Sequence, residues 1–197
     1  MKATILGSNG YGGMLLLRIL ASHPEVDTVI PASRSHAGLP TDEADPGLPH
    51  RYLTAETVRR RVYSPEEALE ESTDVVFSAL PHGASAEVCA PALGRVPVID
   101  LSGDFRYDDE ESFRDAYGFP RPAPEYQERA VYGLTEIYRS AIPGAPIVAN
   151  PGCYPTATLL PLIPVVAAGL VGGTIVVNAL SGITGAGRKA KVNTLFG

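Results

Sequence analysis

Short apolar runs rich in β-branched residues alternate along this chain with segments long enough to form a helix. This alternation is typical of a parallel sheet covered by helices, because consecutive parallel strands need a crossover between them. The predicted strands are residues 3–6, 26–32, 75–79, 96–101, 147–149 and 174–180. The predicted helices are residues 13–21, 84–93 and 154–168, with a short one after the start signal Ser64-Pro65-Glu66-Glu67. We therefore expect an α/β fold with a mostly parallel sheet.

The composition supports a folded domain and excludes several classes of partner. Hydrophobic residues make up 45% of the 197 residues and charged residues 19%, the reverse of a disordered chain. The net charge of −6 opposes binding to nucleic acid. The uncharged stretch 140–187 is broken by prolines and glycines, which predicts buried core rather than a membrane span. Two cysteines without metal-ligand spacing, and no visible export signal, predict a cytoplasmic protein without a metal site.

A glycine-rich segment joins the first predicted strand to the first predicted helix. Its glycines are spaced G-x-x-G-x-x-G, from Gly7 through Gly10 to Gly13. Such a turn lets backbone amides approach a pyrophosphate at the helix N-terminus, so it predicts the dinucleotide site of a Rossmann-like domain. The spacing differs from the strict G-x-G-x-x-G fingerprint, and a plain tight turn is the alternative. The residues expected to contact the cofactor are Gly7, Ser8, Asn9, Gly10, Tyr11 and Gly12.

The end of the second predicted strand indicates which cofactor is bound. An acid at this place binds the ribose 2′-hydroxyl of NAD, whereas a cation accommodates the 2′-phosphate of NADP. This strand ends in Ser33-Arg34-Ser35, without an acid, which favours NADP as the cofactor. The alternative is that Arg34 is an exposed loop residue without a part in cofactor binding. Leu80, Pro81 and His82 follow the next predicted strand and are expected to line the same crevice. For His82, a solvated position at the start of the following helix is the alternative.

Cys153 lies where the strand at 147–149 gives way to a predicted helix, within Asn150-Pro151-Gly152-Cys153. A helix N-terminus stabilises anions and therefore favours the thiolate form, which makes Cys153 a candidate nucleophile. Backbone amides there, together with the Asn150 amide, could hold the oxyanion of a tetrahedral intermediate. Cys89 lies inside a predicted helix and is expected to be an inert, buried side chain.

Two further segments carry groups suited to an anionic ligand. Arg106 ends the segment Asp100-Leu101-Ser102-Gly103-Asp104-Phe105-Arg106 beyond a predicted strand, where open α/β sheets bind ligands, and is the predicted phosphate clamp. The glycine-rich segment 181–189 begins with Ser181 and Gly182 and ends with Arg188 and Lys189, which suits a substrate phosphate or the cofactor pyrophosphate. A mobile surface loop is the alternative for this second segment.

These motifs resemble, in order and spacing, those of the N-acetyl-γ-glutamyl-phosphate reductases, within the semialdehyde dehydrogenase superfamily. The resemblance covers the whole chain and rests on GSNGYGG, ALPHG, DLSGDFR, VYGLTE, NPGCYPTA and SGITGAGRKA. It implies NADPH-dependent reduction of N-acetyl-glutamyl 5-phosphate to the 5-semialdehyde in arginine biosynthesis, with Cys153 attacking the acyl phosphate. It also implies that Asn150, Arg106, Arg188 and Lys189 bind the substrate, that Ser181 and Gly182 contact the cofactor, and that the full-length protein forms a homo-oligomer.

One departure from the family pattern stands out. The family's acid/base histidine belongs to a motif downstream of the glycine–arginine loop, and none of His23, His36, His50 and His82 matches that motif. We therefore expect a fragment, inactive alone, with an NADP-binding domain over residues 1–149 and the start of a second, α+β catalytic domain over 150–197. The alternatives are the lysine-pathway reductase of an N-acetyl-aminoadipyl phosphate, and a non-catalytic NADP-binding fragment or homologue.

Overall fold

The computed structural model of the chain describes residues 1–188, so the predicted site residue Lys189 lies outside the described residues. The first half contains β1 (Lys2–Leu6), α1 (Tyr11–Ala21), β2 (Thr28–Ala32), α2 (Thr41–Ala44), α3 (Arg51–Thr54), α4 (Pro65–Glu70), β3 (Val75–Ser78), α5 (Ser85–Cys89) and β4 (Val98–Asp100). The second half contains α6 (Glu110–Tyr117), α7 (Pro124–Gln127), β5 (Ala130–Tyr132), α8 (Thr135–Tyr138), β6 (Ile147–Ala149), α9 (Cys153–Ala167) and the 3₁₀ helix η1 (Ile183–Ala186).

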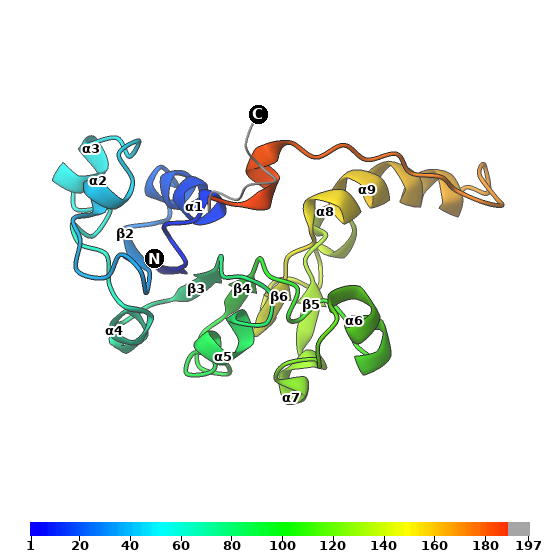
Figure 1. Cartoon of the computed structure of the whole chain (residues 1–197), viewed down its shortest axis with the longest axis horizontal. Helices are drawn as coiled ribbons and strands as arrows, with labels where there is room; N and C mark the ends of the chain where they lie inside the picture. The colour runs from blue at the N-terminus through cyan, green and yellow to red at the C-terminus, as the bar shows by residue number, and fades with distance from the viewer. Residues whose placement is uncertain (189–197) are drawn as a thin grey trace.

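The strands form one sheet in the order β2-β1-β3-β4-β6-β5, and every described pairing is parallel. This confirms the expected Rossmann-like α/β fold. Figure 1 shows α1 on one side of the sheet and α4 and α5 on the other. Because parallel strands run the same way, the loops that follow them gather at one edge of the sheet.

Alternate residues of each strand face opposite layers, which is why the sheet has a core on both sides. Ala3 and Ile5 of β1 pack with Leu17 and Leu20 of α1. Leu6 faces the other way and belongs to the cluster that includes residues of α4 and α5, such as Ala68, Leu69, Ala86 and Cys89. The sheet is therefore buried on both faces, which explains why its strands are continuous apolar runs in the sequence.

The start of α4 follows from its sequence. The amide of Glu67 donates to Ser64 Oγ (3.1 Å), and the amide of Ser64 donates to Glu67 Oε2 (2.9 Å). This capping box satisfies two donors that a helix start would otherwise leave unpaired, and it confirms the predicted start signal. The helix predicted over 84–93 is shorter, since α5 ends at Cys89, two residues before Pro91, where proline disfavours helical continuation.

The strand predicted over 174–180 is wrong. These residues adopt no regular structure and are exposed, with Val176 at 77% and Leu180 at 99% of full exposure. β-Branched side chains favour a strand only where a neighbouring strand supplies hydrogen bonds and a surface to pack on, and no strand among residues 1–188 pairs with this segment. Figure 1 shows α9 projecting away from the sheet and this segment running back towards α1.

No strand was predicted between residues 102 and 146, but the structure contains β5 in this part of the chain. β5 pairs in parallel with β6 at the edge of the sheet, with Val131 opposite Val148. With only three residues, it is too short to give a periodic signal.

Among residues 1–188, no helix combines the length and the apolar character needed to cross a membrane.

Candidate active site

A cavity of about 370 Å³ lies where β1, β2 and β3 end. It brings together residues from three predicted motifs that lie far apart in the sequence. Its lining consists of Gly7, Asn9, Ser33, Arg34, Ser35, Pro65, Leu80, Pro81, Ala84 and Val88. Pro65, Ala84 and Val88 were not predicted as site residues, because nothing in the sequence distinguishes them from residues that only pack in the core.

The glycine turn at this cavity is built from close backbone contacts. Gly7 has φ +82°, and a Cβ there would lie 2.7 Å from the carbonyl oxygen of Ala79. The amides of Gly7 and Ser8 both donate to the carbonyl of Ala32, so the turn is tied to the end of β2. Gly10 caps α1 without a side-chain hydrogen bond, and the first-turn amides of a helix are suited to an anion. These residues fit the pyrophosphate of a dinucleotide.

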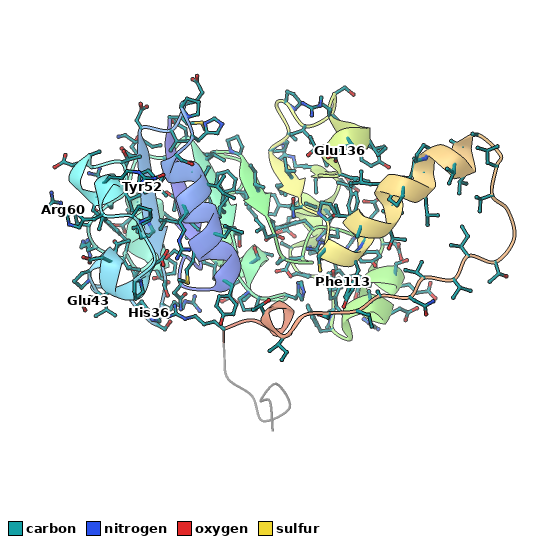
Figure 2. The ribbon with its side chains drawn as sticks, turned by 90° about the horizontal axis from the view of Figure 1, so that it is seen from above. His36, Glu43, Tyr52, Arg60, Phe113 and Glu136 are labelled. Carbon is teal, nitrogen blue, oxygen red and sulfur yellow. The ribbon has the colours of Figure 1, made fainter. Side chains whose placement is uncertain are left out.

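Polar side chains connect the glycine turn to the end of β2. Ser33 Oγ donates to Asn9 Oδ1 (2.9 Å), and Asn9 Nδ2 donates to Ser35 Oγ (3.2 Å). Ser35 Oγ also lies 2.9 Å from His36 Nδ1, and Figure 2 labels His36 close to the start of α1. His36 was not predicted as a site residue. The side chain of Arg34 is 67% exposed, and among the described residues it pairs only with Glu66, at 3.8 Å.

The segments after β3 and β4 are fixed to each other by buried carboxylates. Asp104 accepts hydrogen bonds from the amides of Gly83 (2.6 Å) and Ala86 (3.0 Å). Asp100 accepts from the hydroxyls of Ser85 and Ser102, both at 2.6 Å, and burial raises the pKa of its carboxyl. This network holds the cavity wall formed by residues 80–84 in place.

His82 lies in the same loop, next to the residues that form this wall. Its Nδ1 accepts a hydrogen bond from the amide of Gly103 (2.7 Å), and its ring lies 5.0 Å from that of Tyr117. It lies outside the residues that line the cavity. These contacts give His82 a structural role in joining two loops, and its predicted contact with the cofactor stays a prediction.

Arg106 joins the ends of β4 and β6 beside the start of α9. Its Nε donates to the carbonyl of Asn150 (2.9 Å) and its Nη2 to that of Leu101 (2.8 Å). Its Nη1 donates to Tyr117 Oη (3.2 Å) and lies 3.3 Å from the place that a Cβ on Gly152 would take. A fixed guanidinium therefore lies next to the N-cap of α9.

Cys153 is the first residue of α9, and its side chain is exposed. The Asn150 side chain is turned to its neighbour, with Nδ2 donating to the carbonyl of Pro151 (3.0 Å). An exposed thiol at a helix N-terminus, with a guanidinium nearby, is suited to act as a nucleophile on an anionic substrate. The structure thus places Arg106 against the segment 150–152 that leads into Cys153, and the roles predicted for Cys153, Asn150 and Arg106 stay predictions.

The segment ending in Arg188 reaches the glycine turn. Arg188 Nη1 donates to the carbonyl of Asn9 (3.0 Å) and lies 3.4 Å from that of Ala44. Ser181 and Gly182 precede η1 and are exposed, and Ser181 Oγ donates to the carbonyl of Gly182 (3.1 Å). Arg188, expected on the substrate, therefore contacts the turn that is suited to the cofactor.

Comparison with known proteins identifies the family of this chain. The model described as "Semialdehyde dehydrogenase, NAD binding domain" matches residues 2–145. The chain belongs to the semialdehyde dehydrogenase family. A second model, described as "Semialdehyde dehydrogenase, dimerisation domain", matches residues 153–197 of this semialdehyde dehydrogenase chain.

Curated relatives are similar over the whole chain. Proteins named N-acetyl-γ-glutamyl-phosphate reductase from Ectopseudomonas mendocina (strain ymp) and Moorella thermoacetica are 45% and 42% identical to it over 199 residues. The match covers 100% of this semialdehyde dehydrogenase chain and 56% of each relative, so the chain spans about half their length. A crystal structure of an aspartate semialdehyde dehydrogenase with NADP from Candida albicans has a TM-score of 0.50 and 20% identity, covering 86% of this chain and 48% of that one, and supports the fold.

The two cysteines of this semialdehyde dehydrogenase chain should differ sharply in reactivity. Iodoacetamide at neutral pH should modify Cys153 at least about 100-fold faster than Cys89 in the native protein. Cys153 is exposed, whereas Cys89 is fully buried and burial raises the pKa of its thiol to about 12. Mass spectrometry of the labelled peptides measures both rates, and denaturant should make Cys89 reactive. Equal rates in the native protein would contradict the described burial.

Proposed function

We propose that the protein containing this chain reduces N-acetyl-γ-glutamyl phosphate to N-acetylglutamate 5-semialdehyde and phosphate, with NADPH, in arginine biosynthesis. The observation that carries the proposal is the exposed Cys153 at the N-terminus of α9, on the same sheet edge as the glycine-turn cavity. Relatives at 45% and 42% identity that bear the reductase name support the choice of substrate. The pairing of a thiol site with a dinucleotide cavity is what a two-stage reduction needs.

Cys153 begins the proposed reaction as a thiolate. Its sulfur attacks the acyl carbon, the carbon–oxygen bond to the phosphate breaks, and inorganic phosphate leaves, so that a thioester forms on Cys153. The amides of the first turn of α9 stabilise the negative oxygen formed in the attack. Arg106 fixes the loop that carries Asn150 and supplies positive charge for the phosphate. Once the thioester carbon has received a hydride, the carbon–sulfur bond breaks, the aldehyde leaves, and the thiolate of Cys153 is regenerated.

The cavity residues fit NADP. When bound, NADPH supplies the hydride that reduces the thioester. Gly7 and Gly10 let the backbone approach the pyrophosphate, and Leu80 and Pro81 form an apolar wall. Arg34, Ser33 and Ser35 provide a cation and hydroxyl donors for the 2′-phosphate, and the segment 33–35 contains no acid. The Glu66 carboxylate lies 3.8 Å from Arg34 and is exposed, so the phosphate has to replace that contact.

Arg34→Asp should lower the preference for NADPH over NADH by about tenfold or more. The substitution replaces the attraction for the 2′-phosphate with repulsion, and Arg34 is exposed enough that the fold should not change. Dissociation constants for both cofactors, measured by calorimetry, test the expectation. Arg129→Asp is the matched control, because Arg129 lies beside β5 at the opposite edge of the sheet and its change should leave the preference unaltered.

The activity itself is tested with the full gene product that contains this chain. NADPH consumption should match phosphate release when N-acetyl-γ-glutamyl phosphate is added. Absence of turnover, or a preference for N-acetyl-aminoadipyl phosphate, which is longer by one methylene, would overturn the proposed substrate.

We also infer that the protein forms a homo-oligomer, which the dimerisation-domain match supports. We infer a cytoplasmic location as well, which the two free cysteines support.

A further inference from the structure

A second cavity, of about 400 Å³, lies on the outer side of β2. Its lining shares no residue with that of the glycine-turn cavity. It includes three consecutive arginines, Arg59, Arg60 and Arg61, together with Val58 and Tyr63. In Figure 2, Arg60 lies at the outer edge of the molecule, on the far side of α2 and α3 from the α9 end. This cavity has no part in the reaction described above.

The backbone that carries the arginines is held on both sides. On one side, the amide of Arg59 donates to the carbonyl of Val29 in β2 (3.0 Å). On the other, the Thr41 hydroxyl donates to the carbonyl of Arg59 (2.6 Å), and the Thr41 amide donates to that of Arg60 (2.9 Å). The buried side chain of Val58 anchors the segment in the core. The guanidinium groups therefore extend from a fixed support, as a preorganised binding site requires.

Most of the positive charge at this cavity is not neutralised within the described part of the chain. Arg61 lies 3.4 Å from Glu67 and has its guanidinium carbon 4.1 Å from the centre of the Tyr63 ring. The side chains of Arg59 and Arg60 make no hydrogen bond or ion pair with residues 1–188, and the Nε of Arg59 is buried without an acceptor. A buried donor without a partner is unfavourable and calls for an explanation. One carboxylate, that of Glu56, also lines the cavity.

We propose that this cavity binds a phosphorylated small molecule at a site separate from the dinucleotide cavity. Guanidinium groups form paired, charge-assisted hydrogen bonds with phosphate oxygens, and two of them are available here. The ring of Tyr63 offers contact to an uncharged body attached to the phosphate. The three cations concentrate positive charge in a chain whose net charge is −6, which favours a small anion over an extended nucleic acid.

Calorimetric titration of the protein with inorganic pyrophosphate at low salt tests the proposal. The double variant Arg59→Gln and Arg60→Gln should bind pyrophosphate at least about tenfold more weakly than the parent. The matched control is Arg129→Gln and Arg139→Gln, which removes the same charge from exposed positions elsewhere and should stay within about twofold. The affinity for NADP should not change in either variant, because the two cavities share no lining residue.

Three results would overturn this proposal. They are the absence of pyrophosphate binding to the parent, equal weakening in both double variants, and competition between NADP and pyrophosphate for the arginine-dependent site. If the double variant misfolds, Arg60→Gln alone still tests the proposal, because it alters one exposed side chain. This single variant should weaken pyrophosphate binding severalfold. Thermal unfolding of each variant checks the fold. A failed reductase assay would not affect the outcome of this test, since pyrophosphate binding is measured at a different cavity.

Discussion

Replacing Cys153 with serine is expected to lower acyl-phosphate reduction by about 10³-fold or more in the full gene product. A serine hydroxyl needs a neighbouring base to become a nucleophile, whereas a thiol ionises readily at a helix N-terminus. Among residues 1–188, no side chain makes a hydrogen bond with the exposed Cys153, so none is placed to activate a serine there. Loss of NADPH absorbance after addition of the acyl phosphate measures the effect.

The cofactor provides the internal check on this variant. NADP affinity should stay within about twofold, because Cys153 is not among the residues that line the glycine-turn cavity. Cys89→Ala is the matched cysteine control and should retain most activity, since Cys89 is the buried last residue of α5 and is not exposed to substrate. Residual turnover of Cys153→Ser within tenfold of the parent would remove Cys153 from its proposed role.

Gly13→Ala is expected to lower the free energy of unfolding by about 2–3 kcal/mol or more. A Cβ at Gly13 would lie 2.2 Å from the carbonyl oxygen of Gly7 and 2.8 Å from the Cα of Ser8. Both are backbone atoms, and Gly7 cannot retreat because it already packs against the carbonyl of Ala79. The helix must therefore move away from the turn, which should also weaken NADP binding. Urea unfolding measures the change in stability.

The neighbouring Gly12 is a control of the same chemistry. It lies in the same helix, is exposed, and a Cβ there would meet nothing within 4 Å. Gly12→Ala should leave stability unchanged or raise it by up to ~1 kcal/mol, because alanine loses less backbone entropy in a helix. Equal destabilisation by both substitutions would show that the contact between α1 and the glycine turn is not the cause.

Local features of the sequence were sufficient to predict several elements. β6 has the bounds expected for it, and Ser64 and Glu67 form the predicted capping box. The glycine turn and the start of α9 were also foreseen, because glycine tolerance and helix starts depend on residues within a few positions of each other. The same local reasoning failed at 174–180, where β-branched residues predicted a strand that has no partner within the described chain.

The α/β class, the family resemblance, and the candidate groups for binding an anion or acting as nucleophile could all be predicted from the sequence. Which of these groups meet depends on the tertiary structure. It placed Ser33 and Ser35 beside Asn9, brought Arg188 to the glycine turn, and fixed Arg106 between the ends of β4 and β6. It also exposed the arginine cavity on the outer side of β2. Such contacts join residues far apart in the chain, and their formation depends on strand order and packing rather than on local spacing.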